Sequence, residues 1–165
     1  MRGSPYNEPP FEILPTLADR AALENAPCYF FKRVDHARNF FAKPGDSASL
    51  TLDIAPARGN PAATLRLLLL SDDELFTPEN DPGPDIVRGA WRVTLNGINL
   101  QPAVPLKDAY PFPTPYKAGF FKPGHYLTFA IPAGALKDGA NTFRVRALDA
   151  PRHFRFQWLE IIQRQ

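Results

Sequence analysis

Four stretches of the chain alternate apolar with polar residues at a period of two: 49–54, 91–96, 126–131 and 142–147. Successive side chains of a β-strand point to opposite faces, so this pattern predicts strands with one face in a core. Three further segments read as strands. They are 28–34, the nearly all-apolar 64–71, which suits a central strand covered on both faces, and 153–162. In the last, the alternation changes phase near Trp158 and Leu159, as a β-bulge would produce.

Turn-forming residues separate these segments. The chain has 19 prolines and 10 glycines, and signals such as LNGIN at 95–99 and LKDGAN at 136–141 stand between predicted strands. Many short strands joined by stiff turns are typical of an antiparallel β-sandwich. We therefore predict an all-β fold.

The N-terminal residues have a different pattern. Residues 1–15 are rich in proline and predict an extended arm or linker. The next ten, TLADRAALEN, form the one helical pattern, in which Thr16 can cap the first turn and Asp19 can complete a capping box. A length of 165 residues fits one domain. We expect an arm over 1–15 and a single sandwich domain over 16–165, with one short N-terminal helix.

Charge and hydropathy exclude several classes of partner. The formal net charge is +2, far below the basic excess typical of nucleic-acid binding. No apolar run reaches about 18 residues, and the opening MRGSPYNEPPFEILP lacks the apolar segment of a signal peptide. We expect neither nucleic acid nor a membrane as a partner. The single cysteine, Cys28, cannot form an internal disulfide and is expected to be a buried thiol.

No recognisable catalytic motif is present. The three histidines, His36, His125 and His153, lie in no nucleophile motif, and the usual metal, acyl-transfer and nucleotide signatures are missing. We predict a protein that is not itself an enzyme and requires no cofactor. Glycoside hydrolysis is a lower-ranked alternative, because it needs only two carboxylates about 5 to 10 Å apart, which a sequence cannot place.

The second half of the chain has a specific order of turn elements. A strand ends in an Asn-Gly turn, a later strand ends in a small-residue turn, an L-x-x-G-x-N element leads into the next strand, and the final strand carries an aromatic pair. The residues are Leu95, Asn96 and Gly97; Ile131, Pro132 and Gly134; Leu136, Gly139 and Asn141; and Phe156 with Trp158. Over 48–163 this order resembles galactose-binding-like jelly-roll domains, the β-sandwiches appended to many glycoside hydrolases and polysaccharide lyases.

The resemblance implies a function as well as a fold. It implies a non-catalytic carbohydrate-binding module that recognises a polysaccharide or oligosaccharide. It also implies a catalytic domain in the natural full-length chain, and an extracellular or periplasmic location if that enzyme is secreted. The alternative is a structural accessory domain that packs on a catalytic domain or self-associates through its aromatic loop.

That aromatic loop is DAYPFPTPYKAGFFKPGHY, residues 108–126. Its prolines prevent a regular helix or central strand, so its rings either cover the core or form a ligand platform, and we weigh these equally. As a platform, Tyr110 and Tyr116 would stack on sugar rings. Hydrogen bonds to hydroxyl or acidic groups would come from Arg92, Asp108, Lys117 and His125. For Trp91 and Trp158, both within strands, we expect burial in the core.

An acidic segment, SDDELFTPENDPGPD at 71–85, predicts a long loop. Oxygen-rich loops can hold calcium, and the resemblance implies that a structural calcium is common in such domains. The candidate ligands are Asp72, Asp73, Glu79 and Asp81. Because the spacing lacks the EF-hand pattern, a solvated acidic loop is the favoured interpretation.

Five arginines are expected to point outward from strands: Arg66, Arg92, Arg144, Arg146 and Arg155. Arginine makes bidentate contacts to carboxylate or sulfate, so they could line a surface for an acidic glycan. They could equally form a solvated sheet face paired with Asp53 and Glu160, and this second interpretation is favoured because the strand order is unknown.

Overall fold

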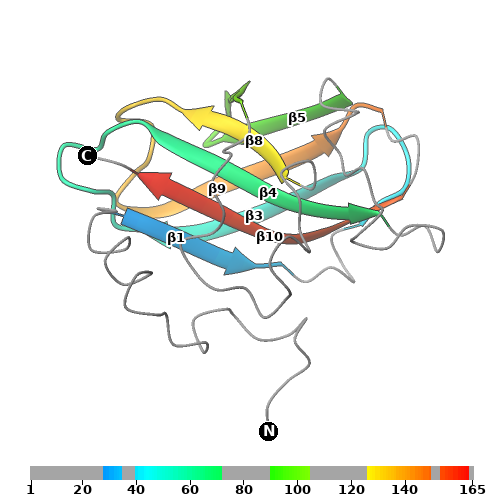
Figure 1. The fold of residues 1–165 in the computed structure, drawn as a ribbon, viewed down its shortest axis with the longest axis horizontal. Coiled ribbons are helices and arrows are strands. Elements are labelled where there is room, and N and C mark those ends of the chain that lie inside the picture. Colours follow the sequence, from blue (N-terminus) through cyan, green and yellow to red (C-terminus); the bar gives the residue numbers. More distant parts are fainter. Residues whose placement is uncertain (1–27, 35–39, 72–89, 105–125, 150–152, 164–165) are drawn as a thin grey trace, which may run out of the picture.

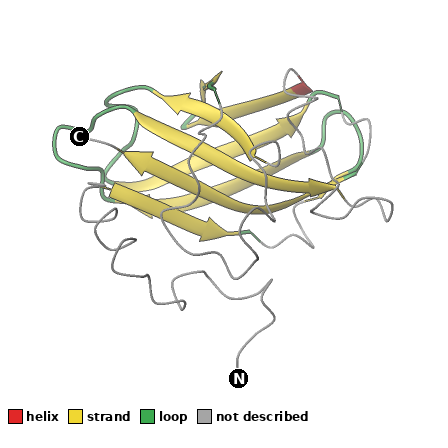
Figure 2. Cartoon of the chain, viewed as in Figure 1, coloured by secondary structure: helices red, strands yellow, loops and turns green. Residues whose placement is uncertain are grey.

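The computed structural model describes residues 28–34, 40–71, 90–104, 126–149 and 153–163. These residues form two antiparallel sheets stacked face to face, with strands making up nearly all of their regular structure (Figures 1 and 2). The predicted all-β antiparallel sandwich is confirmed. The predicted helix at 16–25 lies outside the described residues.

One sheet has six strands and the other has four. The six-stranded sheet runs β1-β10-β4-β8-β7, with β2 also paired to β10, and the four-stranded sheet runs β3-β9-β5-β6. Figure 1 shows the four-stranded sheet behind the six-stranded one. The strands of the larger sheet are β1 (Cys28–Arg33), β2 (Phe40–Phe41), β4 (Ala63–Ser71), β7 (Gln101–Pro102), β8 (Tyr126–Ile131) and β10 (Phe154–Gln163). Those of the smaller sheet are β3 (Ser47–Ile54), β5 (Trp91–Leu95), β6 (Ile98–Asn99) and β9 (Gly139–Ala147).

All seven predicted strands are present, and the short β2, β6 and β7 are additions. The phase change predicted near Trp158 is a register shift between Phe156 and Trp158 where β10 pairs with β4. The central position predicted for 64–71 is also confirmed, because β4 lies between β10 and β8. Its side chains are buried on both faces, Leu67 toward the core and Leu68 away from it.

The core fills the space between the sheets. Trp91 of β5 packs edge-on against Phe41 at 5.0 Å and Phe154 at 5.5 Å between ring centroids. These contacts tie the smaller sheet to the larger, and edge-to-face pairs add to the burial energy of the rings. The core burial expected of Trp91 is confirmed. Trp158 lies in β10, and its side chain is outside what the structure describes.

Two hydrogen-bonded turn motifs lie together at one end of the smaller sheet. Asn96 and Gly97 have φ angles of 49° and 85°, the left-handed conformation that a two-residue hairpin between β5 and β6 requires. Asn141, fully buried, accepts hydrogen bonds from Asn96 Nδ2 at 3.0 Å and Lys137 N at 2.9 Å. It donates to the carbonyls of Lys137 and Gly139. The L-x-x-G-x-N element is therefore a side-chain-locked turn that also holds the hairpin.

Candidate functional site

The outward face of the four-stranded sheet is polar and open to solvent. Along β3 and β9, every second residue is buried or, at Leu50, partly buried against the core, and the intervening ones are exposed or partly exposed. The outward residues are Ser47, Ser49, Thr51 and Asp53 of β3, Ala140, Thr142, Arg144 and Arg146 of β9, and Arg92 and Thr94 of β5. This alternation is the one that the sequence predicts, and it leaves one face free for a ligand.

Strand register brings three arginines together on this face. Arg92 of β5 lies directly opposite Arg146 of β9, and Thr94 lies opposite Arg144. On the other side of β9, Ser47 and Ser49 of β3 are opposite Arg146 and Arg144. Opposed residues of an antiparallel pair have Cβ atoms about 4.5 to 5.5 Å apart. The three guanidinium groups therefore start from neighbouring positions on adjacent strands.

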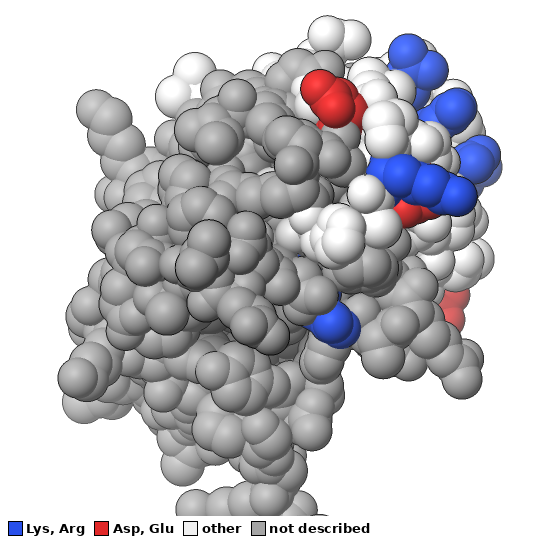
Figure 3. All heavy atoms as spheres, turned by 90° about the vertical axis from the view of Figure 1, so that its right-hand side faces the viewer, with Lys and Arg blue, Asp and Glu red and all other residues white. Residues whose placement is uncertain are grey.

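These arginines line an open cleft of about 320 Å³. Thr94, Gly97 and Asn99 complete its lining, so the β5–β6 hairpin forms part of its wall. Figure 3 shows basic side chains gathered on the described surface at one side of the molecule. The lining contains cationic, hydroxyl and amide groups, all able to donate hydrogen bonds.

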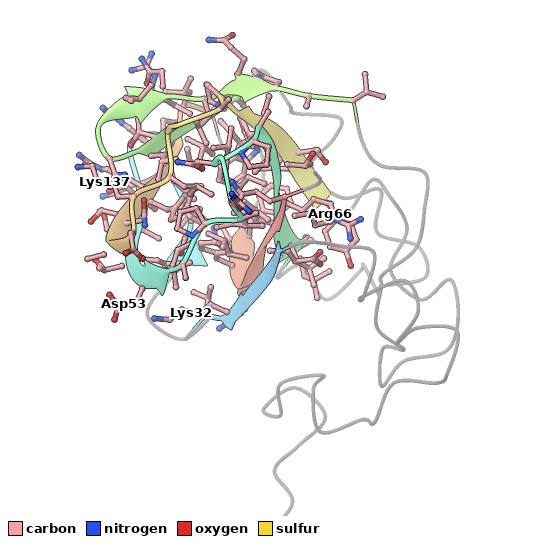
Figure 4. All side chains as sticks on the ribbon, turned by 90° about the vertical axis from the view of Figure 1, so that its left-hand side faces the viewer. Lys32, Asp53, Arg66 and Lys137 are labelled. Carbon is pink, nitrogen blue, oxygen red and sulfur yellow. The ribbon has the colours of Figure 1, made fainter. Side chains whose placement is uncertain are left out.

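The three arginines have no acidic partner among the residues that the structure describes. The ion pair found there joins Arg66 to Glu160 in the other sheet. Arg144 makes a long contact of 3.4 Å with the hydroxyl of Ser47. Asp53, proposed from sequence as a partner, is opposite Ala140 near the other end of β9, where Figure 4 shows it at the end that carries Lys137.

Asp46, in the loop that precedes β3 and lies beside Arg146, is engaged elsewhere. Its Oδ2 accepts hydrogen bonds from the backbone N–H groups of Ala42 at 2.8 Å and Lys43 at 3.0 Å. These two bonds, with a smaller contribution from the charge of Lys43, lower the pKa of Asp46. The same loop is tied to β9, because Gly45 N donates to Ala147 O. Asp46 thus organises the loop beside Arg146.

Arg66 corrects one of the predictions. It does point away from the core, but on the six-stranded sheet, and it is 3% exposed instead of solvated. Its guanidinium donates to Glu160 Oε2 through Nε at 3.2 Å and Nη2 at 2.9 Å, and its Cζ lies 4.9 Å from the ring centroid of Tyr126. Arg155 is half-buried in the same sheet. The five arginines therefore do not form one surface.

The predicted ligand residues are only partly covered by the structure. Arg92 is described and lines the cleft. The others, Tyr110, Tyr116, Asp108, Lys117 and His125, lie outside the described residues, as do the calcium candidates Asp72, Asp73, Glu79 and Asp81. Within the described ranges, no group of three His, Cys, Asp or Glu side chains could hold a metal ion. None of the helices described is long and apolar enough to cross a membrane.

Sequence reasoning did not include Thr94 and Asn99 in the site. Thr94 is two positions after Arg92 on an alternating strand and therefore lies on the same outward face. This spacing could have identified Thr94 from the sequence. Asn99 enters through the hairpin at Asn96–Gly97, since the return strand places it opposite Thr94.

Comparison with known proteins adds little to this description. No family model matches the chain, and no curated protein matches it. Among solved structures, one similar chain is that of BuGH86E322Q in a crystal complex with neoagarooctaose, with 12% sequence identity and a TM-score of 0.45. The similarity covers 81% of this chain and 18% of that one, so this chain spans less than a fifth of its length. Similarity at this level assigns neither a family nor an activity.

Proposed function

We propose that this protein is a non-catalytic carbohydrate-binding module that recognises a polysaccharide or oligosaccharide. The observation that carries the proposal is the exposed cleft on the outward face of the four-stranded sheet. It lies over β5, β6 and β9 and is lined by arginine, threonine and asparagine side chains, which suit the hydroxyl and acidic groups of a glycan.

The shape of the sheet supports an extended ligand. Strand β9 has 9 residues, or about 30 Å at 3.3 to 3.4 Å per residue. Its outward row continues from Arg146 through Arg144 and Thr142, with Ser49 and Thr51 of β3 alongside. A polysaccharide chain laid along this row would meet hydrogen-bonding groups over several sugar units.

The aromatic loop has a proposed role that rests on the sequence. Tyr110 and Tyr116 would stack on sugar rings, and Asp108, Lys117 and His125 would bind hydroxyls. As a separate feature, Asp72, Asp73, Glu79 and Asp81 of the acidic segment would hold a structural calcium ion. The wider setting that we propose is a galactose-binding-like accessory domain attached to a secreted catalytic domain.

The test is a pull-down on insoluble or immobilised polysaccharides, neutral and acidic, with and without EDTA. The module should be retained on at least one glycan, and Arg92→Gln should weaken that retention. The double variant Tyr110→Ala with Tyr116→Ala should also weaken retention if the aromatic loop binds the glycan. A loss of retention in EDTA would support a bound calcium ion. Failure to bind any glycan while the protein remains folded would refute the proposal.

A structural accessory role is the second candidate, favoured by one observation. Ile98 is 52% exposed on the short edge strand β6, and an apolar edge is suited to packing on another surface. Size-exclusion chromatography with light scattering should then show a dimer that Ile98→Lys converts to a monomer. A monomeric wild-type chain would leave docking on a separate catalytic domain as the remaining form of this role.

A further inference from the structure

We propose that the cleft recognises the anionic groups of its glycan, sulfate or carboxylate, and that Arg92, Arg144 and Arg146 bind them. This inference rests on the proposed glycan-binding function and specifies its ligand class. Arg92 and Arg146 would hold one anionic group between them. Arg144, two residues along β9 and about 7 Å away on the same face, would hold the next.

Two of the arginines oppose each other as like charges. Arg92 and Arg146 are direct partners across two antiparallel strands, an arrangement that destabilises a sheet when both residues carry the same charge. Both are exposed, and arginine remains charged at all ordinary pH values. An anion bound between them would convert a repulsive pair into two attractive contacts.

The three arginines also have no counter-charge in the described part of the chain. Arg92, Arg144 and Arg146 form no ion pair there, and Asp46, in the loop beside them, has its Oδ2 occupied by two backbone donors. The neighbouring groups, Thr94 and Asn99, offer further donors. The cleft thus offers positive charge and hydrogen-bond donors to a ligand rich in hydrogen-bond acceptors.

The composition of the cleft favours an anionic glycan over other ligands. Among the described residues, none that lines the cleft is aromatic, so this part of the surface offers no ring on which neutral sugars or nucleic-acid bases stack. The net charge of +2 is also small for a surface that follows a phosphate backbone. Planar guanidinium groups instead suit the bidentate binding of carboxylate or sulfate.

The experiment compares chemically matched polymers by calorimetric titration at low and at physiological salt. The probes are a sulfated galactan and its desulfated form, polygalacturonate and its methyl ester, and duplex DNA as an unrelated polyanion. The test variant is Arg92→Gln with Arg146→Gln. The control is Arg58→Gln with Lys137→Gln, which removes the same charge from exposed residues that follow the end of β3 and precede the start of β9, away from Arg92 and Arg146 (Figure 4 labels Lys137).

We expect one anionic polymer to bind more tightly than its neutral counterpart and than DNA. The test variant should lose tenfold or more in affinity, roughly the effect of losing one charge-assisted hydrogen bond, whereas the control should stay within about twofold by the same conversion. Arg146→Lys should recover part of the loss, since it restores charge without the bidentate geometry. The test variant should also unfold at the same or a higher temperature than the wild type, because repulsion is removed.

Other outcomes overturn the inference. Equal binding of charged and neutral polymers, with no effect of the arginine substitutions, would refute it while leaving the proposed glycan-binding function intact. Binding of DNA as tight as that of the glycan would show general polyanion attraction instead. A test variant that loses stability together with affinity would show that the arginines support the fold. Failure to bind any glycan, charged or neutral, would refute both proposals.

Discussion

Asn141→Ala tests how the fold holds the cleft in place. The Asn141 side chain makes four hydrogen bonds, to Asn96 Nδ2, Lys137 N, Lys137 O and Gly139 O, at 2.8 to 3.0 Å. A protein hydrogen bond contributes a net 0.5 to 1.5 kcal/mol, about 1 on average. Lys137 is exposed and Asn96 partly exposed, so water can replace some of these bonds. We therefore expect a loss of about 2 to 3 kcal/mol rather than the full sum.

For a chain of this size, each kcal/mol of lost stability lowers the thermal midpoint by about 2 to 4 °C, so Tm should fall by about 4 to 12 °C. Urea unfolding and differential scanning calorimetry would measure both quantities. Thr142→Ala is the matched control, since Thr142 is the exposed neighbour and its hydroxyl makes one long contact of 3.4 Å with Thr51. It should cost less than about 0.5 kcal/mol. A loss below about 1 kcal/mol for Asn141→Ala would refute the reasoning.

Three further predictions concern other parts of the sandwich. Trp91→Ala should lower the free energy of unfolding, measured in urea, by about 3 to 5 kcal/mol, because it leaves a cavity where Trp91 packs between the two sheets. Glu160→Gln should lower the free energy of unfolding by a similar amount, because it removes the carboxylate charge that is paired with the buried Arg66. Replacing both residues of the pair by Met and Leu should be nearly neutral or stabilising. Asp46→Asn should destabilise the protein at pH 7. The folded-state pKa of Asp46 is lowered, so its stabilising effect is present above the unfolded pKa and is lost as pH falls through the folded one. Urea unfolding from pH 7 to pH 3 should therefore show that the difference in free energy of unfolding between wild type and variant disappears below about pH 4. A difference that stays constant over this range would contradict the role given to the Asp46 carboxylate.

Most strands and turns of the fold can be predicted from the pattern of neighbouring residues. The alternation in 91–96 predicts both the strand and the outward phase of Arg92, and the Asn-Gly pair predicts the hairpin, because these depend on residues a few positions apart. The bulge near Trp158 was predicted for the same reason. Short strands such as β6 and β7 were not, since two residues carry no periodicity.

The site depended on information that local pattern does not contain. Arg92 and Arg146 are 54 positions apart in the sequence and become partners through the order of β5 and β9. Arg66 alternates with apolar residues much as Arg92 does, yet it is buried against Glu160. The nearly all-apolar run at 64–71 predicts a strand covered on both faces, and this same signal argues against a solvated arginine at position 66.

The central claim is that a glycan binds on the outward face of the four-stranded sheet. Two-dimensional NMR of the ¹⁵N-labelled protein, titrated with the best-binding oligosaccharide, tests it most directly. The account predicts that the largest amide shifts fall on 92–94, 97–99 and 144–146. Shifts confined to the other end of the sandwich, at 55–62 and 132–138, or to the six-stranded sheet, would contradict it.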